Sequence, residues 1–111
     1  MFDFIRNRAQ ALQPDMVECF RYLHRHPETA HHEQNTNAYI RTMLDRFGVR
    51  WEGPADNITI AVVESGQPGP VVGLRCDTDA LPVTEETGLE YASENPGVMH
   101  ACGHDAHITL G

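Results

Sequence analysis

Three His, one Cys and one Asp lie within eight consecutive residues near the end of the chain, in the segment HACGHDAH, residues 100–107. Cys102 and His104 are separated only by Gly103. Glycine permits unusual dihedral angles, so a kinked backbone could aim the thiolate and the imidazole at one point. These two groups together suit zinc and other first-row transition ions. The spacing predicts two metal ligands, while a buried structural Cys and His is the alternative that it leaves open.

The residues after Cys102 predict a third helix, which begins near His104. His104 and His107 would then lie on one face of that helix. Asp105 would either cap the helix or hold a ligand His through the second nitrogen of its ring.

A second candidate segment is RCDTDALP, residues 75–82. It ends the apolar run VVGLRCD, which predicts an interior strand covered on both faces. Asp77 and Asp79 would lie at the carboxyl edge of that strand, where open α/β sheets bind ligands. In an extended chain both side chains point the same way, so they could orient a metal site or act as acid and base. The alternative is a turn at the strand end in which Asp serves as a cap.

Two helices are expected to precede these segments. Pro14 and Asp15 predict the start of the first helix, and Pro27 predicts its end. Its apolar stripe comprises Met16, Cys19, Phe20 and Leu23, with Cys19 as a small core residue. The second helix is expected over residues 32–47, before a left-handed Gly48. Its buried face would consist of Thr36, Ile40, Met43, Leu44 and Phe47.

Four His lie between the two helices, at positions 24, 26, 31 and 32. Because Pro27 interrupts them and no spacing fits one helical face, we expect solvated or hydrogen-bonded side chains rather than a metal cluster. Farther along, NITIAVVES predicts a strand with Ile58, Ile60 and Val62 on one side. Two helices followed by a β-turn-β unit predict an α/β fold.

Composition narrows the classes of partner. The net charge of −8 disfavours nucleic acid, because the surface would repel phosphate groups. The sequence has no apolar run that could span a membrane and no recognisable secretion signal, so we expect a cytoplasmic protein. Three Cys without a CxxC pair make a disulfide framework or a redox motif a poor interpretation.

The chain resembles the amino-terminal part of the M20 family of metallo-amidohydrolases. The branch concerned contains hippurate hydrolase, N-acyl-amino-acid amidohydrolases and auxin-conjugate hydrolases. Three blocks carry the resemblance: FRYLHRHPETAHHEQNT has the LHxxPE signature, GLRCDTDALPVTEETGLEYAS the RxDxDALP block, and NPGVMHACGHDAHITLG the HACGHDxH block. They occur in the family's order and cover essentially the whole chain.

The resemblance implies that residues 1–111 are the amino-terminal segment of a three-layer α/β/α, zinc-peptidase-like catalytic domain. This segment would be incomplete, with the smaller lid or dimerisation domain absent. We therefore expect a fragment of a longer hydrolase, whose full-length parent could form a homo-oligomer. A truncated, non-catalytic metal-binding remnant is the alternative.

By position, Cys102 and His104 match metal ligands, and Asp79 matches the catalytic aspartate that supports the site and its water. Positions that support the ligands or define the motifs are Asp77, His100, Asp105 and His107. The implied cofactors are two divalent ions per complete site, Mn²⁺ or Zn²⁺, with Co²⁺ or Ni²⁺ as further candidates. The implied reaction is cleavage of the amide bond of N-acyl amino acids or related small amides by a metal-activated water. The family's general base and remaining ligands match nothing in these 111 residues.

A third hypothesis makes Cys102 a nucleophile with His104 as its base. It is the weakest of the three, because such pairs usually meet across a fold rather than within one short segment.

Overall fold

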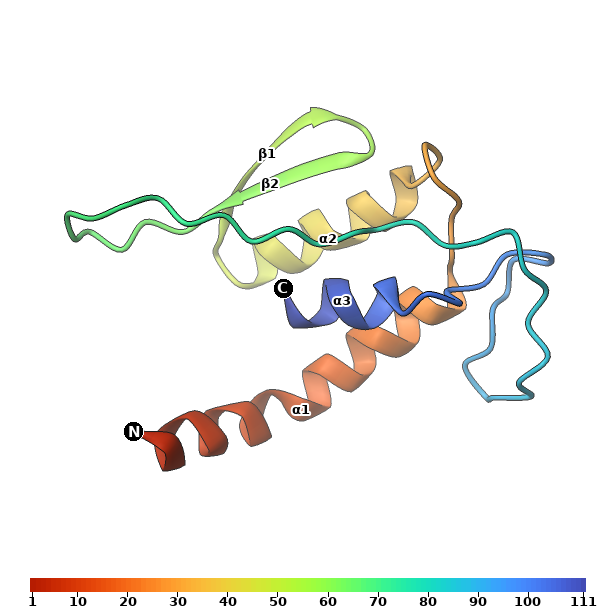
Figure 1. The fold of residues 1–111 in the computed structure, drawn as a ribbon, viewed down its shortest axis with the longest axis horizontal. Helices are drawn as coiled ribbons and strands as arrows, with labels where there is room; N and C mark the ends of the chain where they lie inside the picture. Colours follow the sequence, from red (N-terminus) through yellow and green to blue (C-terminus); the bar gives the residue numbers. More distant parts are fainter.

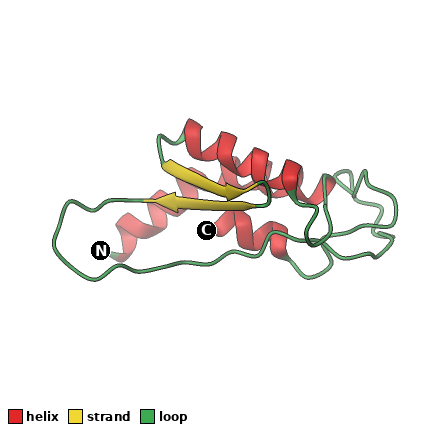
Figure 2. Ribbon diagram, turned by 90° about the horizontal axis from the view of Figure 1, so that it is seen from above, coloured by secondary structure: helices red, strands yellow, loops and turns green.

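Three helices and a two-stranded sheet form the fold in this computed structural model, which describes all 111 residues. The helices are α1 (Phe2–Arg25), α2 (Gln34–Arg46) and α3 (His104–Leu110). The strands β1 (Arg50–Ala55) and β2 (Ile58–Val62) pair antiparallel. Helix α3 lies along the second half of α1, and the hairpin packs on α2 (Figures 1 and 2). None of the helices has both the length and the apolar character needed to cross a lipid bilayer.

Helix α1 is longer than predicted. It begins at Phe2, not near Pro14, and Pro14 lies inside it. Proline removes one backbone hydrogen bond, but the preceding residues include good helix formers such as Ala, Leu, Arg and Gln, so the helix continues through it. The predicted end holds, because the last helical residue is Arg25, two positions before Pro27.

Helix α2 and its cap agree closely with prediction. Gly48 adopts the left-handed conformation, with φ of 68°, directly after the helix. Thr36 is buried, and Ile40, Met43 and Leu44 are half-buried, whereas Phe47 is 56% exposed. The sequence pattern therefore identified most of the covered face of this helix.

The side of β2 that packs against the rest of the molecule differs from the prediction. Strand β2 lies within the predicted segment, but Ile58 and Ile60 are about half exposed. Thr59 faces α2 instead, where its hydroxyl accepts a hydrogen bond from Arg41 Nε at 3.0 Å and donates one to Asn37 Oδ1 at 2.9 Å. Strand β1 was not predicted, because it contains Gly53 and Pro54, two residue types that are depleted in strands. Pro is tolerated in such an edge strand, where the pairing register is also interrupted.

The interior strand predicted for VVGLRCD is not formed. Residues 70–79 are irregular, and Val71, Val72 and Leu74 are 100%, 79% and 86% exposed. A strand requires a neighbour to satisfy its backbone groups, and no other segment lies hydrogen-bonded beside this one. The following residues are anchored by two isolated bridges instead, Thr29 with Ala80 and Leu81 with Met99.

The buried residues are mostly polar. Leu23 and Ala80 are the buried hydrophobic side chains, at 1% and 3% exposure. The buried polar residues are His24, Glu33, Thr36, Asn37, His100 and Asp105. Three of them, His24, His100 and Asp105, belong to the end of α1, the loop before α3 and the start of α3, and the other three lie at the start of α2.

Candidate metal-site residues and the buried histidine between two carboxylates

His104 and Asp79 contact each other directly, although 25 residues separate them. The Nδ1 atom of His104 lies 2.8 Å from the main-chain oxygen of Asp79 and 3.0 Å from its Oδ1. Both oxygens are acceptors, so Nδ1 must carry the proton. The Nε2 atom has no hydrogen-bond partner and is left with its lone pair in a neutral ring. Metal-binding His residues show this arrangement, in which a carboxylate or carbonyl holds the other ring nitrogen.

Cys102 lies two residues before His104 and is solvent-exposed. Gly103, between them, adopts a left-handed conformation with φ of 87°. A Cβ at that position would meet no atom within 4 Å, so the backbone conformation rather than lack of space favours glycine. Helix α3 begins directly after this turn, at His104.

Asp77 does not lie at a strand end, because the predicted strand is absent. Its carboxylate forms an ion pair with Arg75 at 2.5 Å, and its backbone N–H donates to Nδ1 of His107 at 3.4 Å. His107 Nδ1 lies 3.9 Å from Asp77 Oδ2. The structure thus places one aspartate beside each histidine of α3: Asp77 beside His107, and Asp79 beside His104.

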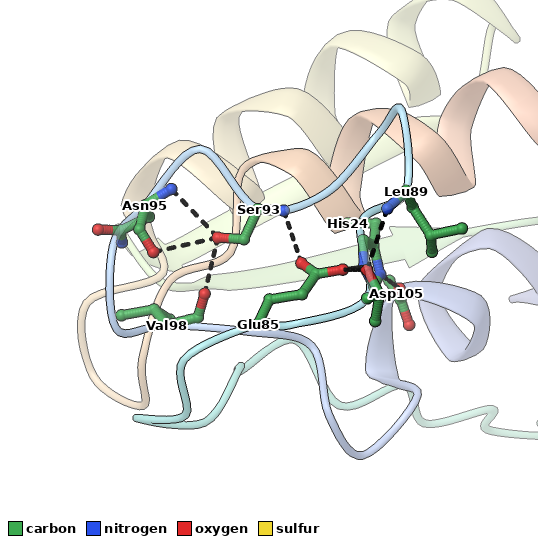
Figure 3. A network of polar contacts seen from close by, with 8 residues as sticks. His24, Glu85, Leu89, Ser93, Asn95, Val98 and Asp105 are labelled. Carbon is green, nitrogen blue, oxygen red and sulfur yellow. Dashed lines mark hydrogen bonds and ion pairs between the residues drawn. The ribbon is translucent and has the colours of Figure 1, made fainter.

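Asp105 neither caps α3 through its side chain as predicted nor contacts a candidate ligand. Its Oδ2 lies 2.6 Å from Nδ1 of His24, and the residue is 2% exposed. On the other side of the ring, His24 Nε2 lies 3.0 Å from Oε1 of Glu85. Figure 3 shows this imidazole between two carboxylates that come from distant parts of the sequence.

The two carboxylates and further contacts set the ionisation of this cluster. Burial lowers the pKa of His24, but hydrogen bonds to Glu85 and Asp105 outweigh it and raise that pKa above 6.5. For Glu85, burial favours the neutral form, yet hydrogen bonds from Thr87, Ser93 and His24 bring its pKa down to about 2. The Thr87 hydroxyl and the Ser93 N–H donate at 2.5 and 2.6 Å. The raised pKa of His24 and the lowered pKa of Glu85 both favour an imidazolium paired with an ionised Glu85, with the Asp105 carboxyl group on the other side of the ring.

Sequence reasoning missed the role of this cluster. His24 was expected to be solvated or hydrogen-bonded, and it is hydrogen-bonded, but no local spacing connects it with Glu85 or Asp105. His31 and His32 are exposed, as expected of solvated side chains. The one available signal was that His24, Glu85 and Asp105 each belong to a different one of the three family-like blocks.

His100 is buried, at 4% exposure, and neither of its ring nitrogens has a hydrogen-bond partner. Burial lowers its pKa, as do nearby His24 and His104, while Asp105 and Asp79 oppose that shift. Its lowered pKa favours a neutral imidazole in this buried position.

The residues present can supply part of a metal site. No three His, Cys, Asp or Glu side chains are grouped so that they could hold an ion by themselves. His104, with Nδ1 held and Nε2 free, and Cys102, with an exposed thiol two residues earlier, have donor atoms that fit a divalent transition ion. The chain thus brings together Asp79 with His104 and Asp77 with His107, but not a complete ligand set.

Comparisons with known proteins agree with the motifs. Residues 73–111 match the peptidase family M20/M25/M40. An N-acyl-L-amino acid amidohydrolase of Geobacillus stearothermophilus is 40% identical over 107 residues, which are 96% of this chain and 29% of that protein. The uncharacterised hydrolase SSP1352 of Staphylococcus saprophyticus is 49% identical over 94 residues, which cover 85% of this chain and 24% of that protein.

Two crystal structures share the fold. A protein from methicillin-resistant Staphylococcus aureus has a TM-score of 0.90 at 42% identity, over 98% of this chain and 29% of its own. The YXEP protein of Bacillus subtilis, described as a dinuclear metal-binding peptidase from the M20 family, has a TM-score of 0.85 at 37% identity, over 90% of this chain and 29% of its own. The chain therefore spans less than a third of the length of these relatives, and its α/β class is confirmed by their fold. The family expected from the motifs is likewise confirmed, and this chain belongs to peptidase family M20/M25/M40.

Proposed function

We propose that residues 1–111 are the amino-terminal segment of the catalytic domain of a metal-dependent amidohydrolase. The complete protein would cleave the amide bond of N-acyl amino acids or related small amides with a metal-activated water. Support comes from the name of the Geobacillus relative, an N-acyl-L-amino acid amidohydrolase, and from the dinuclear metal binding of the Bacillus structure.

In this proposal Cys102 and His104 are metal ligands from this chain, and Asp79 orients His104. Two divalent ions, Mn²⁺ or Zn²⁺ with Co²⁺ or Ni²⁺ as alternatives, would supply the Lewis acidity that polarises an amide carbonyl and activates water. Asp79 would fix the tautomer of His104 by accepting its Nδ1–H. The contacts of Asp77 with Arg75 and His107 give it a supporting position.

The observation that carries the proposal is the pair of contacts from Asp79 to His104 Nδ1, at 2.8 and 3.0 Å. They hold the ring in the orientation and tautomer of a ligand, with Nε2 free. A His with a purely structural role would more often use both nitrogens in hydrogen bonds, as His24 does here.

Metal content tests this assignment in the complete protein. Purified enzyme should contain close to two divalent ions per chain and should hydrolyse an N-acyl amino acid such as N-acetyl-L-methionine. Cys102→Ala and His104→Ala should each lower metal content and hydrolysis together. Cys76→Ala, a matched removal of another thiol 26 positions earlier, should leave both unchanged. Full metal content in Cys102→Ala would refute the ligand role of the thiol.

A second candidate function follows from the absence of a three-ligand group in this chain. By itself the chain would be a non-catalytic remnant that binds a metal ion weakly. The purified 111-residue chain should show no hydrolysis with added Mn²⁺ or Zn²⁺. If it did show turnover that Cys102→Ala abolished, the proposal that the ligand set is incomplete would be wrong.

The remaining elements of the proposal concern partners and location. The substrate would be a small molecule, and we propose neither nucleic acid nor a membrane as a partner. We propose a homo-oligomeric parent in the cytoplasm. Size-exclusion chromatography with light scattering would test the oligomer, and cell fractionation would test the location.

A further inference from the structure

His24 has no role in the chemistry proposed above, yet it is the most closely held side chain near the candidate site. Both of its ring nitrogens contact buried carboxylates, Asp105 at 2.6 Å and Glu85 at 3.0 Å. The rings of Phe20 and Tyr91 pack against the imidazole, with centroids 5.8 and 5.5 Å away. The ring is therefore held in one orientation and is buried, at 6% exposure.

Counting protons shows what the arrangement requires. Asp105 and Glu85 present carboxylate oxygens, which only accept. A neutral imidazole has one N–H and would leave its other nitrogen facing an oxygen, lone pair against lone pair. An imidazolium carries an N–H on each ring nitrogen, so it donates a hydrogen bond to both carboxylates. Its positive charge then lies between their two negative charges. The other ionisable groups nearby are His100, which is neutral, and Arg21, whose guanidinium lies 5.0 Å above the ring of Tyr91.

Asp105 connects this cluster to His104. The two residues are consecutive in the first turn of α3, and the other carboxylate oxygen of Asp105 accepts the N–H of Ala106 at 2.9 Å. Gly103, at the N-cap position, is left-handed and has no side chain with which to cap the helix. The contact of His24 with Asp105 therefore acts beside that of Asp79 with His104: the first holds the backbone turn through Asp105, and the second holds the His104 ring.

Glu85 completes the connection on the opposite side. Its two oxygens accept from His24, from the Thr87 hydroxyl and from the Ser93 N–H, so the loop before α3 holds the imidazole firmly. The chain of contacts runs from residues 85–93 through the end of α1 to the start of α3 (Figure 3).

We propose that His24 is a positioning residue for metal binding: clamped by Glu85, it holds Asp105 and thereby sets the first turn of α3 so that His104 presents Nε2 to the ion. This inference rests on the proposed function. It assigns to the His of the opening LHRHPE segment a task at a site 80 residues away.

The test measures Zn²⁺ affinity of the complete protein by competition with a chromophoric chelator, with the Co²⁺ absorption spectrum as a readout of ligand geometry. His24→Gln should weaken Zn²⁺ binding about tenfold and shift the Co²⁺ bands, because outer contacts of ligands typically contribute 10–100-fold to metal affinity. Leu23→Ala is the matched control: it lies one residue away, is also buried and should lower stability without changing either metal readout.

A double variant separates positioning from general damage. In His24→Gln the amide can donate to Asp105, but its carbonyl faces the carboxylate of Glu85. Adding Glu85→Gln provides an N–H for that carbonyl, so the double variant should recover most of the lost Zn²⁺ affinity. If His24→Gln proves unfolded, Glu85→Ala alone should still weaken Zn²⁺ binding at least threefold.

The outcomes are distinguishable. Wild-type Zn²⁺ affinity and Co²⁺ spectrum in His24→Gln or in Glu85→Ala would overturn the positioning role while leaving the proposed function intact. Equal losses of affinity in His24→Gln and Leu23→Ala would also overturn it, because the effect would then be one of stability. A wild-type protein that binds no Zn²⁺, Mn²⁺ or Co²⁺ would overturn the proposed function and this inference with it.

Discussion

Two regions that are adjacent in the sequence, residues 63–75 and residues 76–105, differ in how they are held. In the first, Val71 is fully exposed and no backbone hydrogen bond links the segment to another element. In the second, Ala80 N–H donates to Glu28 O at 2.7 Å, Leu81 and Met99 exchange hydrogen bonds, and Glu94 N–H donates to Arg25 O at 2.8 Å. Figure 1 shows the first region running out from the end of β2 as a wide loop, and the second forming loops beside the start of α3 and the end of α1.

The difference lies in the kind of interaction that each sequence requires. The second region is rich in polar groups whose partners lie within this chain, at the end of α1 and the start of α3. The first contains the apolar run VVGL, residues 71–74, which would need neighbouring strands and covering side chains that these 111 residues do not provide. The candidate site thus belongs to the part of the chain that is ordered by its own hydrogen bonds, and the following predictions test that contrast.

The largest effect is expected for His24→Leu in the complete protein. Leucine leaves Glu85 and Asp105 buried without a cation, and removal of one partner from a buried ion pair typically costs about 3–5 kcal/mol. Chemical denaturation at pH 6 would measure it. Arg50→Ala is the contrasting variant in the hairpin, where an exposed ion pair with Glu64 should contribute less than about 1 kcal/mol. Similar losses for both variants would contradict the contrast.

Leu23→Ala should cost about 2–5 kcal/mol, because Leu23 is 1% exposed and its removal leaves a cavity. Val71→Ala in the 111-residue chain should change the free energy of unfolding by less than about 0.5 kcal/mol, since the side chain is fully exposed there. Parallel urea titrations of the two variants would compare the regions directly. A large cost at Val71 would show that this segment is packed in solution.

The buried cluster predicts a stability maximum at mildly acidic pH in the metal-free protein. Glu85 has a folded pKa of about 2 against an ordinary 4.5, so its contribution is complete above pH 4.5 and is lost as the pH falls from there toward 2. His24 has a raised pKa, so its contribution is complete below pH 6.5 and is lost as the pH rises through the folded value. Denaturation from pH 3 to 8 should show both slopes. An unchanged profile in Glu85→Gln would exclude this group as the cause of the acid slope.

The smallest effect is expected for Glu28→Ala. The Glu28 carboxylate accepts hydrogen bonds from the Thr36 hydroxyl at 2.6 Å and from Asn35 Nδ2 at 2.9 Å. It also accepts hydrogen bonds from the backbone N–H groups of Asn35 and Thr36, in the first turn of α2. It thus caps the helix from six residues before its first turn, and loss of such a cap costs about 1 kcal/mol. Hydrogen exchange should accelerate at the amides of residues 35 and 36. Glu28→Gln, which keeps acceptor oxygen, should show a smaller change.

The sequence predicted the local features well. Helix periodicity identified α2, and the end of α1 before Pro27 and the left-handed Gly48 followed from residue type. The third helix was predicted to begin near His104, and it does. The motif blocks identified the family and the candidate residues. These features depend on dihedral preferences and on spacing along one element, which a sequence displays directly.

Features that depend on neighbours were harder to predict. VVGLRCD has the composition of a buried strand, but a strand forms only where another strand pairs with it. Pro14 predicted a helix start because proline lacks a backbone N–H and destabilises a helix interior. The helix nevertheless runs through Pro14, because the residues on both sides of it favour the helical conformation. The prediction of which face of β2 is covered was wrong. Hydrogen bonds of Thr59 with Arg41 and Asn37, rather than the burial of Ile side chains, hold the hairpin on α2.

The sequence by itself determined the chemistry available: a thiol, an imidazole and a carboxylate in two short motifs, and a His in a third. Only the tertiary structure decided which of these groups meet. Asp79 reaches His104, and His24 reaches Asp105 and Glu85, across separations of 25, 81 and 61 residues. Such pairings follow from the path of the whole backbone, because a carboxylate can ionise and orient an imidazole only when the fold brings both into hydrogen-bond distance and removes competing water.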